Sequence, residues 1–325
     1  MKHSNHAYKA FFRATVAVLF SISTLLTASF SASAQNLSLT QAGYYHLNIG
    51  DFEVTALSDG TVPQNLHQLL KNAKPGEIDR QLKENFQTDP VELSVNAYLI
   101  KSGDQLILVD AGTAGAYGPT LGHLTESLAH AGYKPEQINA VLITHIHIDH
   151  TGGLMNGENL TFPNATIYIS KPEVDFWFNP ESKAKAPESL KTYFAQAEAT
   201  VGPYLKAGKV KIFTYGAELF PGITPVATPG HTPGHTSYLV ESKSQMIMFF
   251  GDIMHVAAVQ LADPAVTIVY DVDQQTAAIQ RKKTFADAAK NGYWVAGDHL
   301  SYPGIGHIRA NGVSYVFVPA NYSIK

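Results

Sequence analysis

One short segment near the middle of the chain restricts the fold more than any other, because it carries three imidazoles and a carboxylate within six positions. It reads Thr144-His145-Ile146-His147-Ile148-Asp149-His150-Thr151-Gly152-Gly153 and directly follows the apolar run 140–143, which is typical of a buried strand. In an extended segment residues two apart share a face, so His145 and His147 can chelate one ion. The glycines turn the chain and can aim Asp149 and His150 at a second ion. The pattern indicates a metal site at the end of a strand rather than a solvated histidine-rich loop.

Three further segments can supply ligands to the same site. Residues 227–235 place His231 and His235 on two Pro-Gly turns, whose stiff backbone preorganises ligands. Asp252 follows the apolar run 248–250, and His299 ends the segment Val-Ala-Gly-Asp-His. Each of these residues lies where a strand gives way to a loop, the usual place for functional groups on a rigid scaffold.

The absence of cysteine decides which ligands are available. Among 325 residues the chain has 14 histidines and no cysteine, which excludes a disulfide scaffold, a thiolate zinc finger, an iron–sulfur protein and a cysteine nucleophile. Imidazole and carboxylate ligands suit Zn²⁺, which we take as the default, and also Mn²⁺, Co²⁺ or Fe²⁺. A purely structural zinc site is disfavoured, because such sites are usually closed by cysteines.

Charge composition bears on the partners. The chain has 23 basic and 27 acidic residues, a balance that gives no global field for nucleic acid or anionic membrane. We therefore expect no nucleic-acid partner. The oligomeric state is left open, a homodimer being one option.

Residues 1–34 have the order of a secretory signal peptide. A basic start, with Lys2, Lys9 and Arg13 and no acid, precedes an apolar run and then Ala32-Ser33-Ala34. A retained membrane anchor is the alternative, but polar residues interrupt the run and it is short for a bilayer span. We expect cleavage after Ala34, a periplasmic or secreted protein of net charge −7 without a stable membrane anchor, and a single domain over 35–325.

The rest of the chain alternates predicted strands and helices. The predicted strands are Phe52–Leu57, Val95–Ile100, Leu106–Val109, Val141–Thr144, Thr166–Ser170, Ser237–Val240, Met246–Phe250, Tyr293–Val295 and Tyr315–Val318. The predicted helices are Glu77–Phe86, Leu121–Ala131, Glu188–Val201 and Thr276–Ala289. The first half holds more adjacent strands than a doubly wound fold would, which favours an α/β (α+β) protein with two sheets and helices outside.

The ligand segments together resemble the metallo-β-lactamase superfamily, whose pattern is His-x-His-x-Asp-His, a His in a Pro-Gly turn, a Gly-Asp and a distal His. Asp110-Ala111-Gly112 resembles the Asp-x-Gly turn of that family. Segments such as Ala56-Leu57-Ser58-Asp59-Gly60 and Pro303-Gly304-Ile305-Gly306-His307 are similar to the methyl parathion hydrolase branch, and the match extends from Gly43 to Ser323. The resemblance implies an αββα sandwich, two mixed β-sheets flanked by helices, with a dinuclear centre at one edge.

The resemblance also implies the ligand set and the chemistry. It assigns His145, His147 and His231 to one metal, and Asp149, His150 and His299 to the other, with Asp252 bridging. His235 then packs or supports the ligands. Two ions can hold a bridging hydroxide that cleaves lactones, aryl esters or organophosphate triesters. Asp149 either passes a proton to the leaving group or only binds metal.

Substrate recognition is predicted from a few side chains. Tyr117, Trp177 and Phe194 match pocket-lining regions of the branch, where aromatics would favour flat, apolar leaving groups, although core burial is the alternative. His255 departs from the branch, whose parathion-hydrolysing members tend to carry an apolar residue there. It either donates to a carbonyl oxyanion as a catalytic residue or is a histidine that only supports the ligands or is merely exposed. His307 has no assigned role.

Two other functions are open at this point. A metallo-type β-lactamase would share the metal loop, but the Gly251-Asp252 pair is typical of the lactonase and phosphotriesterase side of the superfamily. A non-catalytic metal-binding protein with a retained fold is the other alternative, and the presence of all seven expected ligands disfavours it.

Overall fold

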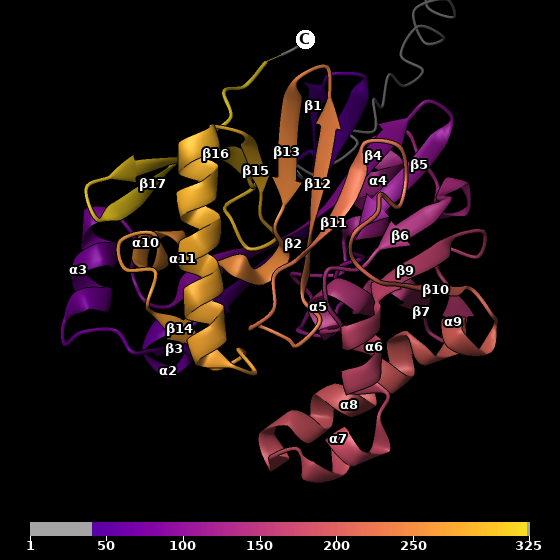
Figure 1. Ribbon diagram of the computed structural model, residues 1–325, viewed down its shortest axis with the longest axis horizontal. Helices are drawn as coiled ribbons and strands as arrows, with labels where there is room; N and C mark the ends of the chain where they lie inside the picture. Colours follow the sequence, from indigo (N-terminus) through magenta and orange to yellow (C-terminus); the bar gives the residue numbers. More distant parts are fainter. Residues whose placement is uncertain (1–40, 324–325) are drawn as a thin grey trace, which may run out of the picture. The chain divides into compact units, whose positions relative to one another are not determined.

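The computed structural model describes residues 41–323, and the chain from Ala42 onward forms one compact unit. Its first sheet has the strand order β1-β2-β4-β5-β6-β9-β10 (Figure 1). The strands are β1 (Tyr44–Ile49), β2 (Phe52–Gln64), β4 (Val91–Ser102), β5 (Gln105–Val109), β6 (Ala140–Leu142), β9 (Thr166–Ser170) and β10 (Val210–Phe213). The pairs from β1 to β5 are antiparallel, whereas β5, β6, β9 and β10 run parallel.

The second sheet has the order β11-β12-β13-β15-β16-β17 and is built from the last third of the chain. Its strands are β11 (Ile223–Ala227), β12 (Thr236–Ser242), β13 (Gln245–Phe249), β15 (Trp294–Ala296), β16 (Ile305–Asn311) and β17 (Ser314–Pro319). Only β13 and β15 pair in parallel. Both sheets are therefore mixed.

Helices cover the outer face of each sheet. The first sheet is covered by α4 (Leu124–His130), α6 (Lys171–Trp177), α8 (Glu188–Thr200) and α9 (Gly202–Lys206), and the second by α11 (Gln274–Asn291). Short elements complete the fold. They are α2 (Leu66–Leu69), β3 (Leu70–Lys71), α3 (Glu77–Glu84), η1 (Pro135–Gln137), α5 (Ile148–Thr151), η2 (Gly152–Leu154), β7 (Met155–Asn156), β8 (Asn159–Leu160), α7 (Pro180–Lys185), η3 (Gly251–Ile253), α10 (Ala257–Gln260) and β14 (Thr267–Ile268).

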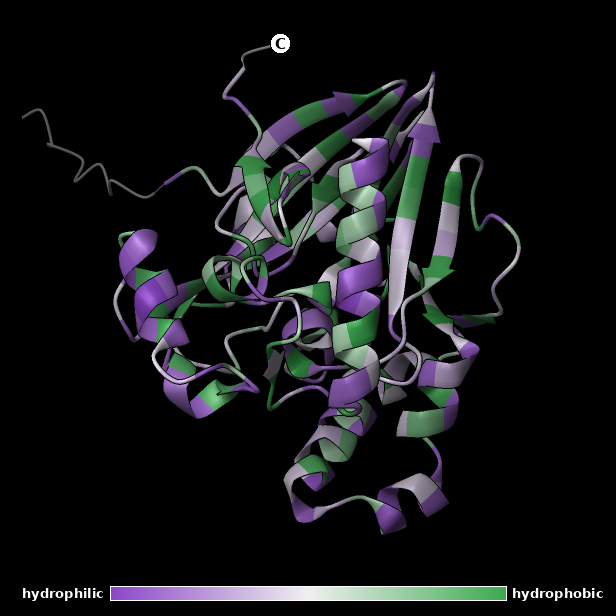
Figure 2. Ribbon diagram, turned by 60° about the vertical axis from the view of Figure 1, so that its left-hand side comes forward, coloured by the Kyte–Doolittle hydropathy of each residue, from purple (hydrophilic) through white to green (hydrophobic). Residues whose placement is uncertain are grey.

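Successive side chains along a strand point alternately into the two layers on either side of the first sheet. In β4, Tyr98 and Ile100 pack in a cluster with side chains of the second sheet, whereas Ala97 and Leu99 pack beneath the helices of the first. Because successive strand residues point to opposite faces, one strand serves both layers. Figure 2 shows apolar and polar stretches alternating along α11, whose Phe285 is buried against the second sheet. The predicted αββα sandwich is confirmed.

The observed elements differ from the predicted ones mainly at their ends. Strand β6 ends at Leu142, two residues early, because the N–H and hydroxyl of Thr144 donate to the carboxylate of Asp110 instead of continuing the ladder. Helix α4 begins at Leu124 rather than Leu121, because the N–H of Leu124 donates to the buried carboxylate of Asp59. Strands β1, β10, β11 and β16 are not predicted by the sequence patterns used above.

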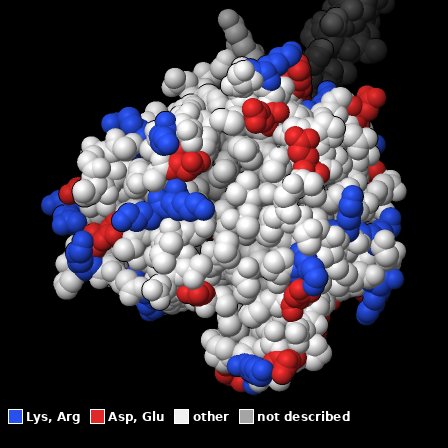
Figure 3. All heavy atoms as spheres, in the orientation of Figure 1, with Lys and Arg blue, Asp and Glu red and all other residues white. Residues whose placement is uncertain are grey.

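Other observations concern the surface and the N-terminal segment. Charged side chains of both signs are interspersed on the face in Figure 3. No helix within residues 41–323 combines the length and apolarity of a bilayer span. The predicted signal peptide, residues 1–34, lies outside the described residues.

Candidate metal centre

The histidine-rich loop is held in place by the end of the neighbouring strand. Asp110 follows β5 and, at a φ of 58°, accepts hydrogen bonds from the N–H and hydroxyl of Thr144, at 2.8 and 2.6 Å. A Cβ on Gly153 would run into the carbonyl oxygen of Ala111, and one on Gly152 into that of Thr113. Only glycines allow the loop to lie this close to the backbone after β5.

Four side chains form a first cluster. The Nε2 of His231 lies 3.1 Å from the Nε2 of His145 and 3.0 Å from the Nδ1 of His147. The Oδ2 of Asp252 lies 3.1 Å from the same His231 nitrogen. All four residues are buried, and their donor atoms lie within 4.8 Å of one another. This cluster contains the three histidines that the resemblance assigns to one metal.

A second cluster shares Asp252 with the first. The Oδ1 of Asp252 lies 3.2 Å from the Nε2 of His150 and 3.2 Å from the Nε2 of His299. The carboxylate of Asp149 completes the group, 3.4 Å from His299. Asp149 and His150 reach it because one helical turn, α5, begins at Ile148, whereas the glycines lie after that turn. The two carboxylate oxygens of Asp252 thus face different clusters.

Most of these imidazoles are oriented by a bond at their outer nitrogen. The Nδ1 of His231 lies 2.8 Å from Asp271, that of His150 lies 2.8 Å from Asp110, and that of His299 lies 3.0 Å from the carbonyl of Ser94. Such partners fix the tautomer and the ring angle of metal-binding histidines. The Nε2 atoms of these three histidines are therefore aimed at the clusters.

The electrostatics of the clusters favour positive charge around Asp252, held either as protons on the histidines or as metal ions that displace those protons. Burial would lower the pKa of His231, but the adjacent carboxylates of Asp252 and Asp271 raise it to about 9. Burial would likewise raise the pKa of Asp252, but His150 and His299 hold it well below its usual range. The carboxylate of Asp252 thus retains a negative charge in a buried site, where positive charge must balance it.

Buried polar atoms without partners test whether metal ions fit. In the described part of the chain, the Nε2 atoms of His150 and His299 and the Oδ1 of Asp252 are buried and accept or donate no hydrogen bond. These three atoms face one another in the second cluster. Buried polar atoms that make no hydrogen bond are costly, and nitrogen and oxygen ligands are those that Zn²⁺ accepts. The donor set fits a pair of divalent cations.

Comparison with known proteins places the fold in a family. The family model described as the metallo-beta-lactamase superfamily matches residues 90–317, which is most of the chain. The chain belongs to the metallo-beta-lactamase superfamily. The matched range contains all seven residues of the two clusters.

Individual superfamily members are similar over different lengths. The solved hydrolase AbOPH of the beta lactamase superfamily is 36% identical, with a TM-score of 0.83, and the match covers 87% of this chain and 99% of AbOPH. AidC, a dizinc quorum-quenching lactonase solved with the product N-hexanoyl-L-homoserine, is 28% identical, with a TM-score of 0.80 and coverage of 86% and 98%. The N-acyl homoserine lactonase AttM of Rhizobium johnstonii is 24% identical over 149 residues, 40% of this chain and 50% of AttM. The chain thus spans half or less of the length of the curated relatives it matches.

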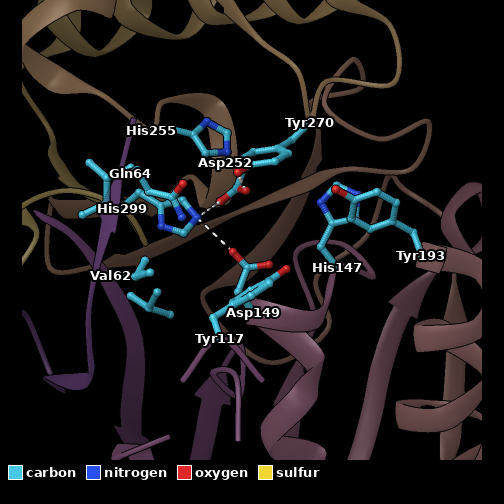
Figure 4. A pocket seen from close by; sticks show the side chains of 12 residues that line it. Val62, Gln64, Tyr117, His147, Asp149, Tyr193, Asp252, His255, Tyr270 and His299 are labelled. Carbon is cyan, nitrogen blue, oxygen red and sulfur yellow. Dashed lines mark ion pairs between the residues drawn. The ribbon is translucent and has the colours of Figure 1, made fainter. Parts of the chain in front are cut away.

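Four residues of the two clusters, His147, Asp149, Asp252 and His299, line an open cavity (Figure 4). One wall is mainly apolar, with Val62, Leu93 and Val95 beside Gln64. Three tyrosines from separate segments, Tyr117, Tyr193 and Tyr270, also line the cavity. Burial and the nearby carboxylate of Asp149 raise the pKa of Tyr193, so its phenol is neutral at ordinary pH.

Two of the predicted pocket residues are placed differently. Trp177 and Phe194 are fully buried in the core beneath the first sheet and do not line the cavity, so this part of the prediction is wrong. Adjacent helical residues point in directions about 100° apart. Tyr193 of α8 therefore faces the cavity while Phe194 faces the core. Trp177 packs its ring 5.6 Å from that of His147, behind the cavity floor.

The remaining histidines differ in their contacts. His235 supports the ligands, since its Nε2 accepts the N–H of Asp252 at 3.0 Å. His255 lines the cavity, but its Nε2 lies 3.0 Å from Asp252, and its ring stacks on that of His299. His307 lies on β16 with its ring against Trp294, away from the two clusters.

Several residues around the centre were missed by sequence reasoning. Asp271 and Asp298 contact ligand histidines, Glu173 binds two ligand loops, and Tyr270 lines the cavity. Asp298 could have been found, because it directly precedes His299. The others are single polar residues without a motif, so only the folded chain reveals their role.

Proposed function

We propose that this protein is a metal-dependent hydrolase that binds two divalent ions, zinc by default, and cleaves the ester bond of lactones and aryl esters. The observation that carries the proposal is the convergence of seven histidine and aspartate side chains in two clusters that share Asp252. Four of these side chains line one cavity, and buried atoms that make no hydrogen bond face one another in the second cluster. Hydrolysis of organophosphate triesters is proposed as a side activity.

The ligand roles follow from the two clusters. His145, His147 and His231 would hold one ion, and Asp149, His150 and His299 the other. Asp252 would contact both, because its Oδ2 faces the first cluster and its Oδ1 the second. When bound, the ions supply Lewis acidity for the scissile carbonyl and activate water at neutral pH.

Asp149 is suited to move a proton. It lines the cavity, and its side chain is 19% exposed, whereas that of Asp252 is 2% exposed. A carboxylate that reaches the cavity can accept a proton and release it to a leaving alkoxide or phenoxide. Binding metal without proton transfer is the alternative role. Asp149→Asn protein that retains metal but loses turnover would support proton transfer, whereas joint loss of metal and turnover would support metal binding alone.

The substrate class is supported by the cavity and by the relatives. A wall of valine and leucine side chains suits an acyl chain or an aromatic ring, and three phenol groups can pack against flat groups or hydrogen-bond to polar ones. AidC was solved with N-hexanoyl-L-homoserine, and AttM is named as a lactonase. We extend this substrate class to the present protein.

Export is proposed from the sequence of residues 1–34. A secretory signal removed after Ala34 would leave a periplasmic or secreted enzyme. The test is the N-terminal sequence of the protein recovered from the periplasm. A mature chain that begins at Gln35 supports the proposal, and an intact residue 1 on a membrane-bound protein contradicts it.

The decisive experiment joins metal analysis to a substrate panel. The panel contains dihydrocoumarin, N-hexanoyl homoserine lactone, an aryl ester, a phosphotriester and a cephalosporin, each assayed with and without chelator. We expect about two metal ions per chain and chelator-sensitive lactone and aryl ester hydrolysis. His145→Ala should abolish the hydrolysis of both lactone and aryl ester. His307→Ala, which changes a histidine outside the clusters, should leave both activities in place. Activity without metal would contradict the mechanism, cephalosporin turnover alone would identify a β-lactamase, and an inert, metal-free protein would support a non-catalytic role.

A further inference from the structure

Glu173 is a buried carboxylate at the start of α6 that none of the roles above uses. It is 1% exposed, and within residues 41–323 no basic side chain pairs with it. Instead each of its oxygens accepts two hydrogen bonds. The Oε1 accepts from the N–H of Ile146 at 2.8 Å and from the indole of Trp177 at 2.7 Å. The Oε2 accepts from the hydroxyl of Thr232 at 2.7 Å and from the N–H of Gly234 at 2.9 Å.

Three of these four donors, those of Ile146, Thr232 and Gly234, belong to the segments that carry the first cluster. Ile146 lies between His145 and His147, and Thr232 directly follows His231. The carboxylate of Glu173 therefore joins two loops that are more than eighty residues apart in sequence and that supply all three histidines of that cluster. Hydrogen bonds to a buried charged acceptor are among the stronger ones in proteins.

The local packing leaves little freedom around this junction. A Cβ on Gly234 would collide with the backbone nitrogen of Glu173, so the turn and the start of α6 are in direct contact. The hydroxyl of Ser170, the residue that precedes α6, donates to the carbonyl of Gly234 at 2.7 Å. Residues at the start of α6 thus bind both the N–H and the carbonyl of Gly234, which lies in the His231 turn.

We propose that Glu173 is a positioning residue that sets the His231 turn against the His145–His147 loop, and that it thereby determines metal affinity at the three-histidine position. The inference rests on the proposed metal centre. Glu173 makes none of the proposed metal contacts, and it acts through the backbone on either side of the ligands. Residues of this kind typically change metal affinity by about 10–100-fold.

The substitution Glu173→Gln tests this with the shape of the side chain retained. A glutamine has one acceptor oxygen, and its NH₂ group must face one of the two donor pairs. The hydroxyl of Thr232 can rotate to accept from the NH₂ group, whereas the indole of Trp177 and the N–H of Ile146 can only donate. The amide should therefore turn its nitrogen toward Thr232 and Gly234, which leaves the Gly234 N–H unpaired. We expect the His231 turn to be released and the His145–His147 loop to stay in place.

The experiment is zinc binding to the purified, metal-free protein in competition with a chromophoric chelator. For Glu173→Gln we expect one of the two sites to weaken about 10–100-fold and the other to change less than threefold. Glu77→Gln is the matched control, because Glu77 is also a buried glutamate that accepts a backbone N–H but lies outside the clusters. It should bind zinc as the wild type does.

A second readout does not depend on metal. The chain has two tryptophans, so a Trp294→Phe background leaves Trp177 as the sole fluorescent indole. The bond from Trp177 to the carboxylate ties its emission to this junction, and Glu173→Gln should shift that emission in the metal-free protein, whereas Glu77→Gln should not.

The outcomes separate the two proposals. Folded Glu173→Gln protein with two wild-type zinc affinities would overturn the positioning role and leave the proposed function intact. A wild-type protein that binds no zinc or other divalent ion would overturn the proposed function itself. Equal weakening of zinc binding in Glu173→Gln and Glu77→Gln would show a general loss of stability and would also contradict the inference.

Discussion

His235 accepts the backbone N–H of Asp252 through its Nε2 at 3.0 Å, while its Nδ1 lies 2.8 Å from the hydroxyl of Thr228. Burial lowers the pKa of His235 to about 3, which keeps the ring neutral and its Nε2 free to accept. One histidine of the Pro-Gly turns therefore holds the carboxylate shared by both clusters, while the other, His231, contacts that carboxylate directly.

The variant His235→Ala should show whether His235 supports the metal ligand Asp252 through its backbone N–H. It leaves the buried N–H of Asp252 without a partner, which costs about 1–3 kcal/mol, and it opens a cavity behind the centre. We expect a lower melting temperature and fewer than two bound metal ions, measured by calorimetry and metal analysis. His307→Ala, which removes a half-buried histidine bonded to a backbone carbonyl on the second sheet, should keep both ions. Full metal content in His235→Ala would contradict this role.

Metal removal should destabilise the folded protein. A ligand that binds only the native state adds about 4 kcal/mol of stability at a concentration one thousand times its Kd. We expect chelation to lower the melting temperature of the wild type and to leave that of His145→Ala largely unchanged. A wild-type transition that is insensitive to both chelator and added zinc would argue against tightly held ions.

Tyr117 should contribute to selection of flat substrates. Its side chain lines the cavity and is 47% exposed, so Tyr117→Leu should change the free energy of unfolding by less than about 0.5 kcal/mol. Loss of a ring contact worth about 0.5–1.5 kcal/mol should raise KM for dihydrocoumarin about 2- to 10-fold. KM for N-hexanoyl homoserine lactone should change little, and an equal effect on both substrates would contradict selection by ring stacking.

His255 has two candidate roles that one substitution distinguishes. If the imidazole donates to a carbonyl oxyanion, His255→Leu should lower kcat for lactones by about 100-fold with both metal ions retained. If it only supports Asp252, from which its Nε2 is 3.0 Å away, metal content and lactone turnover should fall together. Intact lactone hydrolysis with increased phosphotriester turnover would show that the oxyanion role is wrong.

The layers of the fold could be predicted from sequence because the patterns that specify them are local. Helix α8 was predicted as Glu188–Val201 and spans Glu188–Thr200, and α11 extends the predicted Thr276–Ala289 by two residues at each end. The N-terminal extension has a clear cause, since the side chain of Asp273 caps the helix by accepting the N–H of Thr276. Element ends depend on such single bonds more than on hydrophobic period.

The candidate ligands were predictable because they lie in short motifs after strands, and the structure brings all seven into two clusters. Apart from Tyr117, the residues of the cavity walls were not predicted, because a wall is made by side chains from separate segments. Tyr270 lies about 150 residues from Tyr117, yet both line one cavity. Whether an aromatic residue faces the cavity or the core depends on the rotation of its helix, as Tyr193 and Phe194 demonstrate.

The seven candidate ligands are divided between the two sheets. The segment from His145 to His150 follows β6 of the first sheet, while His231, Asp252 and His299 belong to loops of the second. Ions held there would act as removable cross-links between the two halves of a chain that has no disulfide. A protein cut between Phe213 and Ile223 should then reassemble from its fragments more tightly in zinc than in chelator, with metal supply deciding whether the halves stay together.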